Sequence, residues 1–131
     1  MSETPAIPVL VVDDNPTNLK LLSYVLASRG YAVQTAADAT SAMAALRARR
    51  PRLILMDLQL PGLDGLELSR SLKADPATRD IIIVAVTAYA MKGDEERALA
   101  AGCNGYIAKP IDTRTFPALI AGYLSATPAK P

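Results

Sequence analysis

Residues 8–18, PVLVVDDNPTN, join an apolar run to two adjacent acids. Positions 9–12 are all apolar, as in a strand that is buried on both faces of a parallel sheet. Asp13 and Asp14 follow with no basic residue nearby in the sequence, so their charge must be compensated from elsewhere. The stretch therefore predicts a buried strand whose carboxyl end carries a charged site.

Composition narrows the classes of protein. The 131 residues, half of them apolar, are enough for one domain with a sizeable core. Fourteen basic residues face thirteen acidic ones, which disfavours direct nucleic-acid binding and binding to an anionic membrane. No apolar stretch approaches the roughly 20 residues of a membrane span, and MSETPAIP is unlike a signal peptide. With a single cysteine, Cys103, these features predict a cytoplasmic location.

The chain contains no histidine. This excludes Ser-His-Asp catalysis, histidine-ligated zinc and a phosphohistidine carried by the chain itself. Carboxylates, hydroxyls and lysine remain for chemistry.

Five strand-like runs alternate with five helix-like patterns. The runs span 7–12, 31–35, 53–56, 81–87 and 105–108. The first helix is expected to begin at Pro16 and to stop at Gly30, and the second to follow a cap at Asp38. The third is expected from Asp64, which can form a capping box with Glu67, and the fourth over 91–101. The fifth is expected after Asp112, with the apolar stripe Phe116, Leu119, Ile120, Tyr123 and Leu124. This alternation predicts an α/β fold with a parallel sheet between helices, followed by a tail or linker start at 125–131.

Polar residues stand at the ends of four of these strands. Asp13 and Asp14 end the first, Asp57 the third, Thr87 the fourth and Lys109 the fifth. Sites of open parallel sheets gather at the carboxyl ends of the strands, so we expect these side chains to converge.

Such a cluster is suited to phosphoryl transfer. Two carboxylates about 4 Å apart repel by ~4 kcal/mol at an effective dielectric of 20, and a hard divalent cation such as Mg²⁺ removes the conflict. A carboxylate nucleophile, a metal clamp and a lysine together match that reaction, with Asp57 as the candidate acceptor.

Each residue also has an ordinary structural interpretation. Asp13, Asp14 and Asn15 are residue types that cap a helix, Asp57 precedes the turn LPGLDG, and Thr87 is a β-branched strand residue. Lys109 alone would be a solvated surface residue. Their joint occurrence at four strand ends favours the functional interpretation.

Four segments in this order, VLVVDDN, LILMDLQLPGLDG, VAVTAYA and YIAKP, resemble the receiver domain of two-component response regulators. The resemblance covers residues 7–124. It implies a flavodoxin-like (βα)5 three-layer sandwich with strand order 2-1-3-4-5 and a receiver domain over residues 1–124. Within the family, the chain is most similar to single-domain receivers of cell-cycle control and to receivers of hybrid kinases.

The resemblance also implies roles for individual residues. Asp57 is the phosphoacceptor. Asp14, Asp57 and the backbone carbonyl of Gln59 ligate Mg²⁺, and Asp13 acts largely through water. The remaining roles are phosphoryl contacts from Thr87 and Lys109, an aromatic switch at Tyr106, a cis peptide between Lys109 and Pro110, and tuning of the phosphoryl lifetime by Gln59 and Tyr89.

The function implied is a phosphoryl-accepting signalling switch rather than an enzyme, changing the face formed by the fourth helix, fifth strand and fifth helix. Its partners are a sensor histidine kinase or histidine phosphotransfer protein and a downstream protein target, without direct nucleic acid or membrane, and its state is a monomer or weak dimer. Asn18 and Lys20, taken as outer residues of the first helix, are the candidates for kinase contact.

Two other functions fit this sequence less well. A Mg²⁺-dependent phosphatase with an aspartyl nucleophile needs a general acid two residues after that nucleophile, where this chain has Gln59. A nucleotide- or flavin-binding domain is disfavoured because both glycine-rich phosphate motifs are absent and the first turn is acidic.

Overall fold

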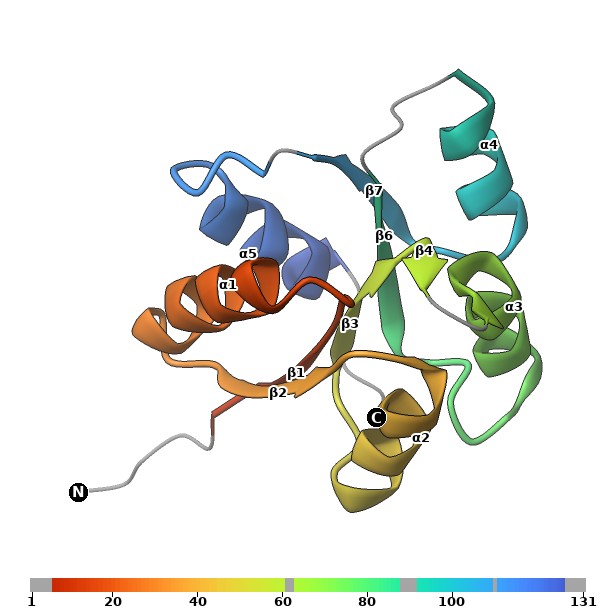
Figure 1. Ribbon diagram of the computed structural model, residues 1–131, viewed down its shortest axis with the longest axis horizontal. Helices are drawn as coiled ribbons and strands as arrows, with labels where there is room; N and C mark the ends of the chain where they lie inside the picture. The colour runs from red at the N-terminus through yellow and green to blue at the C-terminus, as the bar shows by residue number, and fades with distance from the viewer. Residues whose placement is uncertain (1–5, 61–62, 88–91, 110, 127–131) are drawn as a thin grey trace.

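The computed structural model describes residues 6–60, 63–87, 92–109 and 111–126 (Figure 1). Its main sheet has five parallel strands in the order β2-β1-β3-β6-β7. The strands are β1 Pro8–Val12, β2 Ala32–Ala36, β3 Leu53–Asp57, β6 Ile82–Thr87 and β7 Gly105–Ala108. Counted along the chain, this is the predicted order 2-1-3-4-5. Asp57 is the last residue of β3 rather than the first residue after it.

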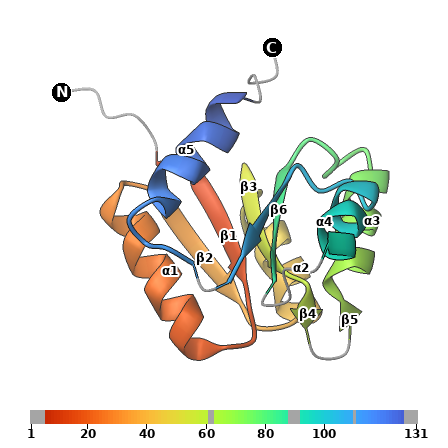
Figure 2. The ribbon, with the colours of Figure 1, turned by 90° about the horizontal axis from the view of Figure 1, so that it is seen from above.

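Helices cover both faces of the sheet. Figure 2 shows α1 and α5 on one face and α2, α3 and α4 on the other. The helices are α1 Pro16–Ser28, α2 Ala39–Ala48, α3 Gly65–Ala74, α4 Lys92–Ala100 and α5 Phe116–Ala126. The three-layer sandwich is confirmed, and α5 extends two residues past the boundary expected at 124.

The apolar run of β1 is explained by the two faces of the sheet. Val9 and Val11 pack into a cluster with the residues of α1 and α5, whereas Leu10 and Val12 pack with residues of α2 and α3. Successive side chains of a strand point to opposite faces, so a strand covered on both faces is apolar throughout. This burial places the end of β1 at a fixed position beneath the helices.

Local capping fixes the start of two helices. Asn15 Oδ1 accepts hydrogen bonds from the backbone N–H of Thr17 at 2.9 Å and of Asn18 at 3.3 Å. Asp38 and Ser41 form a reciprocal capping box at α2. The box expected from Asp64 involves a side chain outside the described part of the chain. These caps fix where α1 leaves β1 and where α2 leaves β2.

Two sequence expectations differ from the structure. Leu119 is 44% exposed, because the buried stripe of α5 runs through Phe116, Ile120 and Leu124 at a spacing of four and leaves Leu119 on the flank. A short antiparallel pair, β4 Gln59–Leu60 and β5 Leu63–Asp64, follows β3 where the sequence indicated only a turn. The fourth helix was expected to begin at Met91, which lies outside the described residues.

Gly65 packs directly behind the end of β3. Its N–H donates to the Leu58 carbonyl at 3.3 Å, and an added Cβ would overlap the backbone carbonyl oxygen of Asp57 and lie 2.8 Å from Leu58 Cα. Backbone cannot swing aside as a side chain does, so Gly65→Ala should lower the free energy of unfolding by about 1–3 kcal/mol, measured by urea titration.

Gly122→Ala is the matched control for this prediction. Gly122 lies within α5 and would meet no atom within 4 Å, so alanine there should raise the free energy of unfolding by about 0.5–1 kcal/mol. Equal stability of the Gly65→Ala variant and the parent would contradict the packing argument.

Candidate functional site

Three carboxylates meet at the carboxyl edge of the sheet. Asp13 follows β1 and is 2% exposed, Asp57 ends β3 and is 4% exposed, and Asp14 is exposed. One oxygen from each of the three lies within 4.8 Å of the others. The three strand-end acids therefore converge as expected, because β1 and β3 are neighbours in the sheet.

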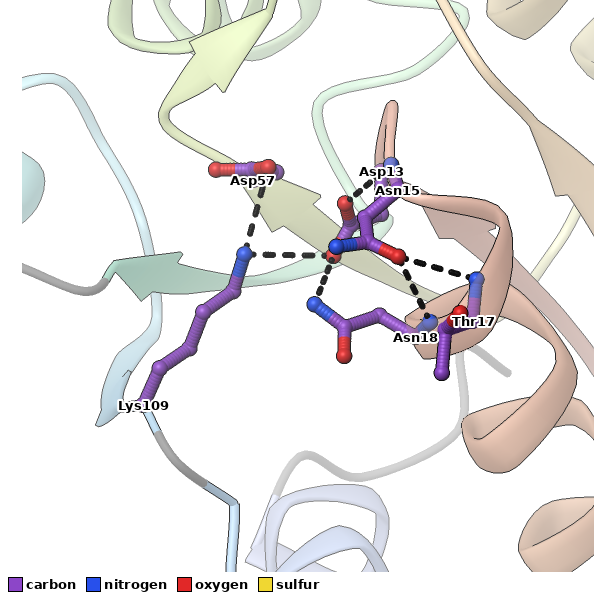
Figure 3. A network of polar contacts seen from close by, with 6 residues as sticks. All are labelled: Asp13, Asn15, Thr17, Asn18, Asp57 and Lys109. Atoms are coloured by element: carbon purple, nitrogen blue, oxygen red, sulfur yellow. Dashed lines mark hydrogen bonds and ion pairs between the residues drawn. The ribbon is translucent and has the colours of Figure 1, made fainter.

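Lys109 supplies the cation that the sequence around Asp13 lacks. Its Nζ lies 3.2 Å from Asp13 Oδ2 and 3.3 Å from Asp57 Oδ2, with the side chain only 19% exposed (Figure 3). Burial alone would lower the pKa of this ammonium, but the carboxylates of Asp57 and Asp13 outweigh burial and hold the pKa above its ordinary value. Among the described residues, one ammonium faces three carboxylates, so their charges sum to an excess of negative charge.

The Asp13 carboxylate is held by further donors. Its Oδ1 accepts the backbone N–H of Asn15 at 2.8 Å, and its Oδ2 accepts the side-chain amide of Asn18 at 3.4 Å. The sequence pattern predicts Asn18 as an outer residue of α1, and this prediction is wrong. The structure places it half-buried and directed at Asp13 (Figure 3). The signal that could have found it is its place in the first helical turn after the acids.

Thr87 lies on β6, the strand beside β3, and Tyr106 lies on β7, the next strand along the sheet. Thr87 ends β6 with 2% exposure, and its carbonyl accepts the Lys109 N–H at 2.7 Å. Tyr106 is half-buried on β7 opposite Ala85 and packs against the core cluster on the α2–α4 face.

The backbone of Gln59 pairs with Asp64 in the short hairpin. The Gln59 side chain, Tyr89 and Pro110, with the expected cis peptide, lie outside the described residues.

The donor set fits a hard divalent cation. All three acids offer carboxylate oxygens, and oxygen-only ligand sets with room for water suit Mg²⁺. The buried pair Asp13 and Asp57 needs positive charge, and Asp14 leaves the cluster open on its exposed side.

The described helices include none that is both long and apolar enough to cross a bilayer.

Comparison with known sequences agrees with this geometry. A sequence profile of the response regulator receiver domain matches residues 9–121. The polar-differentiation response regulator DivK of Brucella anthropi is 45% identical over 116 residues, which cover 88% of this chain and 94% of that protein. The DivK protein of Brucella ovis is 44% identical with the same coverage.

Solved structures show the same architecture. The receiver domain of a sensor histidine kinase from Pseudomonas aeruginosa, crystallised with a magnesium ion coordinated in its active-site cleft, superposes with a TM-score of 0.82. It is 36% identical, and the match covers 92% of this chain and 98% of that one. The receiver domain of a histidine kinase from Syntrophus aciditrophicus gives a TM-score of 0.85 at 29% identity, covering 96% of each chain.

Proposed function

The chain belongs to the response regulator receiver domain family, and from this premise we propose that it is a signalling switch phosphorylated on Asp57. One observation carries the proposal: Asp57 ends the strand between β1 and β6, its Oδ2 lies beside the Lys109 ammonium, and its carboxylate clusters with the other two acids. We assign the receiver domain to residues 1–124, with 125–131 as tail or linker start.

In the proposed reaction an Asp57 carboxylate oxygen attacks the phosphorus of the donor. A P–O bond to Asp57 forms as the bond from phosphorus to the donor's leaving group breaks, and that group departs with the bonding electrons and takes up a proton. We propose a phosphohistidine as the physiological donor, and because residues 1–131 contain no histidine, it lies outside this stretch of chain. Lys109, already beside Asp57, would pair with the phosphoryl oxygens, and Thr87 would contact them from the end of β6.

Asp14, Asp57 and the Gln59 carbonyl would hold Mg²⁺, with Asp13 contributing through water. When bound, the ion would neutralise charge on the acids and on the transferring phosphoryl group. The fit of three oxygen donors to a hard cation supports this choice of metal.

The partners proposed are a histidine kinase or phosphotransfer protein and a downstream protein bound through α4, β7 and α5, with the chain itself a monomer or weak dimer. We place this exchange in the cytoplasm, because a free, buried Cys103 suits a reducing compartment. The phosphatase alternative is not favoured, because glutamine at position 59 offers no proton to a leaving group.

Intact mass spectrometry tests the proposal. The chain is incubated with Mg²⁺ and acetyl phosphate, and we expect its mass to increase by one phosphoryl group. In a control incubation in which EDTA removes the Mg²⁺, we expect no increase in mass. An unchanged mass under these conditions would refute phosphorylation of this chain by a small donor.

Mg²⁺ should also stabilise the fold. The acids repel one another when no divalent cation is present, so a cation that binds only the folded state raises the Tm by mass action. At ten times the Kd the gain is about 1.4 kcal/mol, or about 4 °C, measured by calorimetry. Asp14→Ala should lose most of this gain, whereas Glu95→Ala, an exposed acid on α4, should keep it. Identical melting of the parent in EDTA and in millimolar Mg²⁺ would contradict the prediction.

A further inference from the structure

We propose that Asn18 is a positioning residue for Asp13. Its side-chain amide holds the Asp13 carboxylate in place whether Lys109 pairs with Asp13 or with a phosphoryl group on Asp57. This keeps the metal site assembled. The inference rests on the proposed function for its role in phosphorylation, while the contact itself stands on geometry alone.

Both oxygens of Asp13 are occupied by three donors, two from the start of α1 and one from the residue after β7. Oδ1 accepts the N–H of Asn15 at 2.8 Å, and Oδ2 accepts the Asn18 amide at 3.4 Å and the Lys109 ammonium at 3.2 Å (Figure 3). A carboxylate only accepts, so Asn18 must present its NH₂ group, which fixes the orientation of the amide. A carboxylate that is 2% exposed depends on such donors for its stability.

The first turn of α1 places Asn18 for this contact. The Asn18 backbone N–H donates to the cap Oδ1 of Asn15, while the Asn18 side chain reaches back to Asp13. The cap and the acid therefore restrain the same residue at its backbone and at its side chain. Asn18 is half-buried as a result, whereas Lys20 on the same helix is exposed.

A neutral donor suits this position better than a charged one. Lys109 serves Asp13 and Asp57 at once, and in the proposed reaction it turns to the phosphoryl group on Asp57. Its positive charge also repels an incoming cation, whereas the Asn18 amide carries no net charge. When Lys109 moves away from Asp13, the side-chain amide of Asn18 and the backbone N–H of Asn15 still donate to the Asp13 carboxylate.

The first test measures the affinity for Mg²⁺ by calorimetric titration. Asn18→Ala and Asn18→Leu should both bind Mg²⁺ about fivefold more weakly than the parent, which is the effect of losing one hydrogen bond of ordinary strength. Ser28→Ala, at the far end of α1, should bind as the parent does. Leucine restores volume without a donor, so parental affinity in Asn18→Leu would assign Asn18 to packing and overturn the proposal.

The second test needs no metal. In the metal-free protein, the side-chain NH₂ resonances of Asn18 should shift when Asp13 is replaced by alanine and stay in place in Ser28→Ala. Unmoved resonances in Asp13→Ala would refute the contact. If the parent neither binds Mg²⁺ nor accepts phosphate while these resonances shift, the proposed function fails and the Asn18 contact stands.

The third test measures the rate of phosphorylation by a small donor. Asn18→Ala should slow labelling by acetyl phosphate severalfold, because the defect lies in the site, whereas Ser28→Ala, at the far end of α1, should leave this small-donor rate unchanged. Equal rates for Asn18→Ala and the parent would overturn the assignment of Asn18 to the site.

Discussion

Asp57→Asn is expected to abolish phosphoryl uptake while leaving the fold intact. Asparagine keeps the size and shape of the side chain, but its amide is not a nucleophile toward phosphorus, and the reaction needs a carboxylate oxygen. Asp57 is 4% exposed at the end of a central strand, so an isosteric change avoids opening a cavity there. Intact mass after incubation with Mg²⁺ and acetyl phosphate measures the loss.

The neighbouring acids are poorer candidates for the acceptor. Both oxygens of Asp13 are engaged by donors, and Asp14 is exposed to water. Asp75→Asn is the matched control, because Asp75 lies beyond the end of α3, outside the acid cluster, and asparagine can still accept the Ala77 N–H there. Full labelling of Asp57→Asn, mapped to another residue by peptide analysis, would move the acceptor elsewhere.

Most of the fold could be predicted because it depends on local pattern. A run that is apolar at every position, such as 9–12, requires cover on both faces, and helices between such runs provide it. The site followed from one topological rule, since acids at the ends of β1 and β3 share an edge once these strands are neighbours. Strand limits differed by one residue at several ends, where pairing with neighbouring strands decides the last residue.

Contacts across the sheet could not be predicted from pattern. That Lys109 would bridge Asp13 and Asp57 depends on the path from β7 to the acids, which spans the width of β6. The inward direction of Asn18 depends on how α1 leaves the cap at Asn15. The exposure of Leu119 depends on the angle at which α5 lies on the sheet, which the spacing of apolar residues does not contain.

Thr87→Ala is expected to accept phosphate on Asp57 and yet lose the response of the α4–β7–α5 face. A phosphoryl group adds about −1.5 to −2 charge at one point, which Lys109, beside Asp57, and the hydroxyl of Thr87 at the end of β6 would meet in the proposed function. Moving Thr87 toward Asp57 would empty space beside β6, and Tyr106, one strand over, is the aromatic side chain able to fill it. Alanine preserves the strand and removes the hydroxyl, so the phosphoryl group can no longer form a hydrogen bond to the side chain at the end of β6.

Beryllofluoride, a mimic of the phosphoryl group, provides the measurement. NMR shifts across α4 and β7 on adding it with Mg²⁺ should be large in the parent, small in Thr87→Ala and reduced in Tyr106→Ala. Thr35→Ala is the control, because Thr35 is exposed on β2, the edge strand at the other end of the sheet from β7. Such a switch needs two states within a few kcal/mol, and the phosphoryl group can favour one only through contacts that differ between them. Shifts of equal size in the parent and in Thr87→Ala would mean that the signal reaches this face by a route that bypasses Thr87.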